Sequence, residues 1–116
     1  LHPLRVVAQR LGVYLELGYV FYEMGRKGQK FYFDSASTVF GNLLRVAKAD
    51  SEPWWLAKYM GIAILYERGK DSDIKLAKIA IENLEKNNPE FDSGKHGMKD
   101  RFLELKKKID EVTGGR

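Results

Sequence analysis

Apolar residues recur along the chain at intervals of three or four, which is the period of one face of an α-helix. Caps, glycines and prolines divide this pattern into five predicted helices, at about residues 4–24, 35–48, 52–68, 71–88 and 93–113. Residues 30–34 form the single strand-like candidate, and we expect an ordered loop there or the start of the second helix. The pattern therefore predicts an all-α fold.

The first two helices carry matching apolar stripes. One stripe is Tyr14, Leu17, Phe21 and Met24, and the other is Ala36, Phe40 and Leu43. Gly18 lies within the first stripe, where it costs roughly 0.5–1 kcal/mol relative to alanine, so we expect it at a close helix crossing. Asp34 or Ser35 is the expected N-cap of the second helix. The two stripes together predict a helical hairpin.

A weaker copy of this pattern follows. Gly61 takes the place of Gly18, and Ala77, Ile81 and Pro89 repeat the spacing of the second helix and its end. The final predicted helix has a regular apolar stripe with charged residues elsewhere, at Met98, Phe102, Leu105, Ile109 and Val112. That pattern is typical of a capping helix with a solvated outer face.

The order Tyr14-x2-Leu17-Gly18-x2-Phe21, followed by Ala36-x3-Phe40, resembles the opening signature of tetratricopeptide (TPR) repeats, with aromatic substitutions. The resemblance covers residues 11–89. It implies antiparallel helical hairpins in a right-handed TPR-like superhelix, with hairpins at 4–48 and 52–88 and a capping helix at 93–113 of a single domain, 1–116. Gly18 and Gly61 lie 43 residues apart, whereas TPR repeats have 34, so HEAT or armadillo repeats are the alternative architecture.

The resemblance also implies roles for individual residues. Those expected to pack the repeats are Tyr14, Leu17, Gly18, Phe21, Ala36, Phe40, Gly61, Ala77, Ile81 and Pro89. Because the first helix of each TPR hairpin lines a concave surface, the candidate partner-binding groove comprises Tyr19, Tyr22, Glu23, Trp55, Lys58, Tyr59, Ile62 and Tyr66. The alternative is that these aromatic side chains are covered by the last helix or by further repeats.

Composition limits the chemistry. The chain has 116 residues, is 44% hydrophobic and contains no cysteine, so one domain with a core of its own is expected without disulfides. We expect it to be the C-terminal part of a longer protein. No stretch is long and apolar enough for a membrane span. Neither His2 nor His96 has metal ligands at suitable spacing, and no phosphate loop or nucleophile elbow occurs. We expect no enzyme activity, cofactor or metal site.

A formal net charge of +4 raises nucleic acid as a partner. The densest basic run, Lys106 to Lys108, is however flanked by Glu104 and Asp110, which is typical of a solvated helix face. The sequence therefore favours a non-catalytic protein-interaction or assembly module that binds a protein or peptide segment, other repeats of the same protein or a second copy. The alternatives are a basic nucleic-acid-associated domain and a helical appendage of an enzyme elsewhere in the parent chain.

Overall fold

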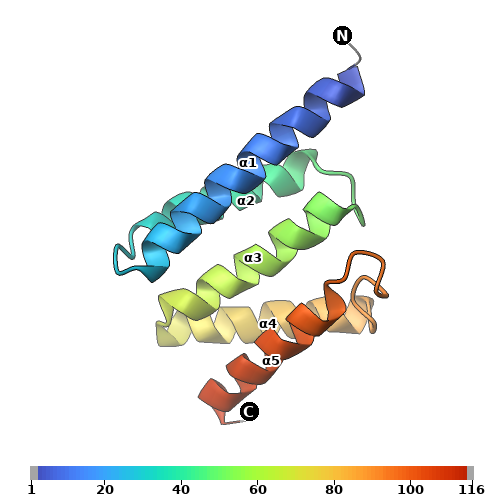
Figure 1. Ribbon diagram of the computed structural model, residues 1–116. Helices are drawn as coiled ribbons and strands as arrows, with labels where there is room; N and C mark the ends of the chain where they lie inside the picture. Colours follow the sequence, from blue (N-terminus) through green and yellow to red (C-terminus); the bar gives the residue numbers. More distant parts are fainter. Residues whose placement is uncertain (1–2, 115–116) are drawn as a thin grey trace. The chain divides into compact units, whose positions relative to one another are not determined.

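The computed structural model describes residues 3–114, with side chains from residue 10 onward, and contains five helices in that range (Figure 1). They are α1 (Pro3–Arg26), α2 (Tyr32–Val46), α3 (Glu52–Arg68), α4 (Asp71–Asn87) and α5 (Lys99–Thr113). No strand occurs within the described residues, so the predicted all-α class is confirmed. None of these helices is both long and apolar enough to cross a membrane.

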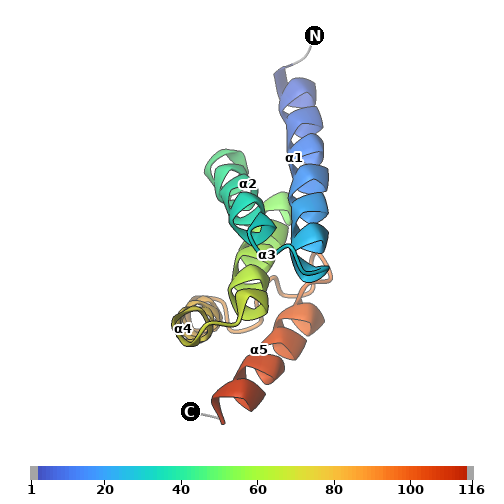
Figure 2. The same ribbon diagram turned by 90° about the vertical axis from the view of Figure 1, so that its left-hand side faces the viewer.

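The chain divides into two compact units, Leu1–Ile64 and Leu65–Arg116, and the division falls within α3. The first unit contains α1, α2 and most of α3. Here α1 and α2 run antiparallel, and α3 follows beside them (Figures 1 and 2). The second unit contains the last turn of α3 together with α4 and α5.

The core of the first unit is centred on α2. Its buried residues recur every three or four positions, as the stripe predicted, and residues of α3 join them. The cluster, called the α2 core below, consists of Phe33, Ala36, Phe40, Leu43, Ala47, Ala57, Met60 and Ile64. Phe40 and Leu43 are completely buried, so the amphipathic pattern of the second predicted helix corresponds to its packing.

Two glycines of α1 each accept a phenylalanine ring from α2. A Cβ atom placed on Gly18 would lie 2.6 Å from Cζ of Phe40, and one placed on Gly25 would lie 2.7 Å from Cδ1 of Phe33. Both pairs fit one antiparallel register, because the members of each helix are seven residues apart. Only glycine allows the rings so close to the backbone, and this explains why positions 18 and 25 of α1 are glycine.

The packing face of α1 is rotated from the predicted one. Leu11, Leu15 and Tyr22 pack on the α2 core and share a face with the two ring-accepting glycines. Of the expected packing residues, Tyr14 and Leu17 are instead 39% and 40% exposed. Phe21 is half-buried, with its ring stacked on that of Tyr32 at 5.7 Å between centroids. The two glycines determine where α1 crosses α2, and the large side chains on the same face of α1 pack around that crossing.

The second helix begins at Tyr32, three residues before the predicted residue 35, so residues 32–34 of the strand-like candidate form the start of this helix, one of the two outcomes expected for them. Phe31 occupies the N-cap position without a side-chain cap hydrogen bond, so neither Asp34 nor Ser35 serves as the expected cap. Both lie within the first turn of the helix. Phe33, which is 1% exposed, also lies in this turn, and we attribute the early start to burial of that ring, which outweighs the missing cap.

Gly61 differs from its expected counterpart Gly18. A Cβ atom at Gly61 would meet nothing within 4 Å, so the structure does not place this glycine at a close helix crossing. The other packing residues expected in the second copy differ in their burial. Ala77 and Ile81 of α4 are fully buried, whereas Pro89 is exposed in the turn that follows α4.

The loop between α4 and α5 is organised by Asp92, whose side chain is buried. Its carboxylate accepts hydrogen bonds from the backbone amides of Gly94, His96 and Met98, at 2.9, 3.2 and 2.9 Å. The predicted start of the last helix at residue 93 is wrong for this reason, and α5 begins at Lys99. The aspartate keeps these amides in a turn, so the chain becomes helical only after Met98.

The backbone of this loop has an unusual conformation. Phe91 and Ser93 have positive φ angles of 53° and 56°, although neither is glycine. Phe91 is nevertheless buried, with its ring stacked on that of Phe102 of α5 at 4.7 Å between centroids. Ring burial and the Asp92 hydrogen bonds together hold a conformation that costs on the order of 1 kcal/mol for each such residue.

Candidate interaction surfaces

The predicted groove residues do not form one accessible face. Trp55 and Ile62 are 1% and 5% exposed, so both belong to the interior. The indole Nε1 of Trp55 donates a hydrogen bond to Oδ1 of Asp50 at 2.7 Å. A buried indole with its polar atom satisfied within the chain is a packing residue. The interpretation of Trp55 and Ile62 as groove residues is therefore wrong.

The predicted groove tyrosines of the first unit are half-buried. Tyr19, Tyr22 and Tyr59 all pack on the α2 core. The ring of Tyr19 meets that of Phe40 edge-on at 5.6 Å, and the ring of Tyr22 tilts against that of Phe33 at 6.0 Å. The structure therefore brings these three together as the border of the core. Each of the three side chains remains half-buried.

The remaining groove candidates are scattered. Glu23 is exposed and ion-paired with Arg26 at 3.3 Å. Lys58 is half-buried with its Nζ 5.1 Å from the ring centroid of Trp54, and Tyr66 is half-buried in the second unit. No single surface is therefore defined by the eight predicted residues.

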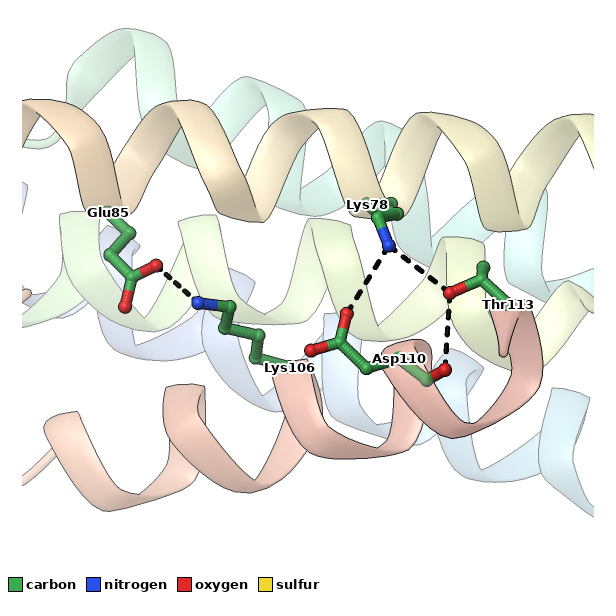
Figure 3. Close-up of polar contacts among 5 residues, drawn as sticks. All are labelled: Lys78, Glu85, Lys106, Asp110 and Thr113. Carbon is green, nitrogen blue, oxygen red and sulfur yellow. Dashed lines mark hydrogen bonds and ion pairs between the residues drawn. The ribbon is translucent and has the colours of Figure 1, made fainter. Parts of the chain in front are cut away.

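Polar contacts join α4 to α5 within the second unit (Figure 3). The ammonium group of Lys78 donates a hydrogen bond to Oγ1 of Thr113 at 3.3 Å and lies 3.5 Å from Oδ1 of Asp110. Farther along the same two helices, Nζ of Lys106 donates to Oε1 of Glu85 at 2.5 Å. The pairs cross from one helix to the other at two levels, so they fix the antiparallel register of α4 and α5.

An open hollow lies beside the Lys78 contact, where the start of α4 meets the end of α5. It measures about 580 Å³, and its lining consists of Gly69, Asp71, Ile74, Lys75, Lys78, Ile79, Glu82, Val112 and Thr113. We call it the α4–α5 hollow. Ile79 and Val112 line it from the two helices, and they are 57% and 59% exposed. Two large apolar side chains therefore face solvent across one concave surface.

Sequence reasoning missed the α4–α5 hollow. The stripe through Ala77 and Ile81 was interpreted as the buried face of the helix, which it is, but Ile79 lies on another face. An isoleucine outside the main stripe of a charged helix was the available signal. Val112 was assigned to the apolar stripe of the last helix, and the structure exposes it where that stripe reaches the end of α5.

Both positively and negatively charged side chains surround the hollow. Within residues 3–114, Lys75 has no ion-pair partner, whereas Lys78 is held by Asp110. The hydrogen bond that Lys106 donates to Glu85 raises the pKa of Lys106, and the hydrogen bond that Lys99 donates to Glu90 likewise raises the pKa of Lys99. Four basic residues of this unit are therefore engaged by carboxylates of the same unit: Arg68, Lys78, Lys99 and Lys106.

The start of α4 is fixed by a bidentate ion pair. The guanidinium of Arg68 donates to the Asp73 carboxylate from Nη2 at 2.8 Å and from Nε at 3.3 Å. These hydrogen bonds lower the pKa of Asp73 below its usual value, against the raising effect of burial. The carboxylate lies in the first turn of α4, where it also complements the exposed backbone amides. This pair holds α4 at one end of the α4–α5 hollow.

Comparison with protein-family models, with curated proteins and with solved structures found no match for this chain.

Proposed function

We propose that this chain is a non-catalytic interaction module, built from TPR-like helical hairpins, that binds a segment of a protein partner in the α4–α5 hollow. The observation that carries the proposal is the exposure of Ile79 and Val112 on the two sides of this concave surface. The size of the hollow, about 580 Å³, is within the range of binding pockets. The resemblance of residues 11–89 to TPR repeats also supports the role of an interaction module.

An amphipathic helix is the occupant that best fits the hollow. The α4 lining runs from Asp71 to Glu82, which corresponds to about 16 Å or three helical turns at 1.5 Å per residue. The apolar side of such a helix would cover Ile79 and Val112, as in helix-in-groove recognition. An acidic residue of the partner would then face Lys75, and a basic residue would face Glu82.

A nucleic-acid partner is less well supported. Phosphate binding requires several lysines or arginines that are free to replace counterions along one surface. Lys99, Lys106 and Lys78 are instead engaged by Glu90, Glu85 and Asp110. The basic net charge therefore comes with internal ion pairs and does not by itself define a phosphate-binding surface.

The proposal is tested by changing Ile79 in the full chain. Capture of a specific protein from source lysate should fall at least tenfold for Ile79→Lys, because a buried apolar contact at the centre of an interface is typically worth about 2 kcal/mol. Leu76→Lys is the matched control, since Leu76 is 54% exposed on the same helix and does not line the hollow. Capture that is nuclease-sensitive and equal for both variants would contradict the proposal and favour the nucleic-acid alternative.

A further inference from the structure

Helix α1 has a second row of apolar side chains, separate from its packing face. Val13, Leu17 and Val20 follow each other at intervals of four and three and are 65%, 40% and 54% exposed. In Figure 2 the other two helices of this unit, α2 and α3, both lie to one side of α1. A helix that packs on one neighbour needs one apolar stripe. Helix α1 therefore has the surface of a helix with two neighbours.

The spacing of this row matches a coiled-coil interface. Arg10 and Met24 extend it at either end, which gives positions 10, 13, 17, 20 and 24 at alternating intervals of three and four. We call these five positions the outer row of α1. Alternation of this kind keeps one line of side chains facing a partner helix over several turns. A second long helix is accordingly the partner that the row fits.

The charges near the row limit the orientation of that helix. Arg10 ends the apolar row and, within the described part of the chain, has no carboxylate partner. A charge within such a row needs an opposite charge across the interface, and this need specifies register. Glu23 flanks the other end of the row and is well exposed. Its Oε1 accepts a hydrogen bond from Arg26, which leaves Oε2 for a further donor.

We propose that the outer row of α1 pairs with the same row of a second copy of this chain, antiparallel about a two-fold axis that passes between Glu16 and Leu17. Val13 and Val20 are equally distant from this midpoint, and so are Arg10 and Glu23. An antiparallel pair therefore places Val13 against Val20 of the other copy, and Arg10 near Glu23 of the other copy. A parallel pair would set Arg10 against its own equivalent, which is repulsive.

Two general features support a second copy as the occupant. A two-fold interface uses the same surface on both chains, so both outer rows are covered and association stops at the dimer. Antiparallel helices also place the positive end of one helix dipole beside the negative end of the other, which is favourable. This inference concerns α1 alone and does not depend on the α4–α5 hollow.

Sedimentation equilibrium over a concentration series tests the proposal. The wild-type chain should show a reversible monomer–dimer equilibrium. Leu17→Lys should weaken association at least a hundredfold, because the change occurs twice at the centre of a two-fold interface. Val46→Lys is the matched control: Val46 is 59% exposed on α2 and lies outside the outer row, so its variant should dimerise as the wild type does. Circular dichroism confirms that both variants are folded.

Charge exchange tests the antiparallel arrangement. Arg10→Glu and Glu23→Arg should each weaken the dimer by about tenfold, and the double variant should recover most of the loss, because each exposed ion pair contributes modestly and occurs twice in the dimer. A chain that is monomeric at every concentration would overturn the proposal. Dimerisation unaffected by Leu17→Lys, or a double charge variant weaker than either single variant, would overturn it equally.

Discussion

Replacing Gly18 by leucine should destabilise the first unit by about 3 kcal/mol, at the upper end of the usual cost of overpacking. The first added atom, Cβ, would already lie 2.6 Å from the ring of Phe40. That ring is completely buried, so it has no free space into which to move. Denaturant unfolding followed by tryptophan fluorescence measures the effect, because both tryptophans, Trp54 and Trp55, belong to this unit.

Alanine substitutions provide the control. Gly18→Ala and Gly25→Ala should both destabilise, since each Cβ would meet a phenylalanine ring at 2.6–2.7 Å. Gly12→Ala should instead stabilise by about 0.5–1 kcal/mol, because Gly12 lies in the same helix with nothing within 4 Å of the added atom. If all three variants unfolded alike, the close approach of the α2 rings to α1 would be contradicted.

Replacing Asp92 by alanine should destabilise the second unit by about 3 kcal/mol. Three backbone amides would lose a carboxylate acceptor, and hydrogen bonds to charged groups typically contribute about 1.5–3 kcal/mol each before water replaces part of the loss. The positive φ angles of Phe91 and Ser93 would also lose the contacts that maintain them. Thermal unfolding followed by far-ultraviolet circular dichroism measures the change.

Amide hydrogen exchange locates the effect of this substitution. The amides of His96 and Met98 should exchange faster in Asp92→Ala, because the carboxylate is their acceptor. Asp100→Ala is a suitable control, since Asp100 is exposed in the first turn of α5 and should cost no more than about 1 kcal/mol. Unchanged protection of Met98 in the Asp92 variant would show that the carboxylate does not organise the loop.

Much of the helix arrangement could be predicted from the sequence. The third helix begins and ends as predicted, at Glu52 and Arg68, because Asp50 to Pro53 supply a start signal and Gly69 a stop. The stripe through Phe40 and Leu43 was also informative, since these side chains are fully buried. Periodicity works well where a helix has one apolar face and clear ends.

Periodicity was less informative for α1, which is apolar on more than one side. Two overlapping stripes then fit the same spacing, and the choice between them depends on which glycines accept a ring from another helix. That contact joins residues distant in sequence, such as Gly25 and Phe33. The predicted start of the last helix, at residue 93, was wrong for a related reason. A short Asp-Ser-Gly segment resembles a helix start, but the Asp92 carboxylate accepts hydrogen bonds from backbone amides as far along the chain as that of Met98.

The candidate site was the least predictable part. The groove residues correspond to the inner positions of TPR repeats, and this chain uses Trp55 there as a core residue that donates a hydrogen bond to Asp50. The exposure of Ile79 and Val112 arises from the geometry of α4 and α5, which the Lys78 and Lys106 contacts fix. No local sequence pattern specifies that geometry.

Site-specific photo-cross-linking tests the central claim, that the α4–α5 hollow binds a helical segment of a protein partner. A photoreactive phenylalanine derivative placed at position 79 or at position 112 should cross-link to the same partner protein in source cells, on the apolar side of one amphipathic helix. The same derivative at position 76, exposed on α4 outside the hollow, should not. Equal cross-linking from all three positions, or none from positions 79 and 112, would contradict the claim.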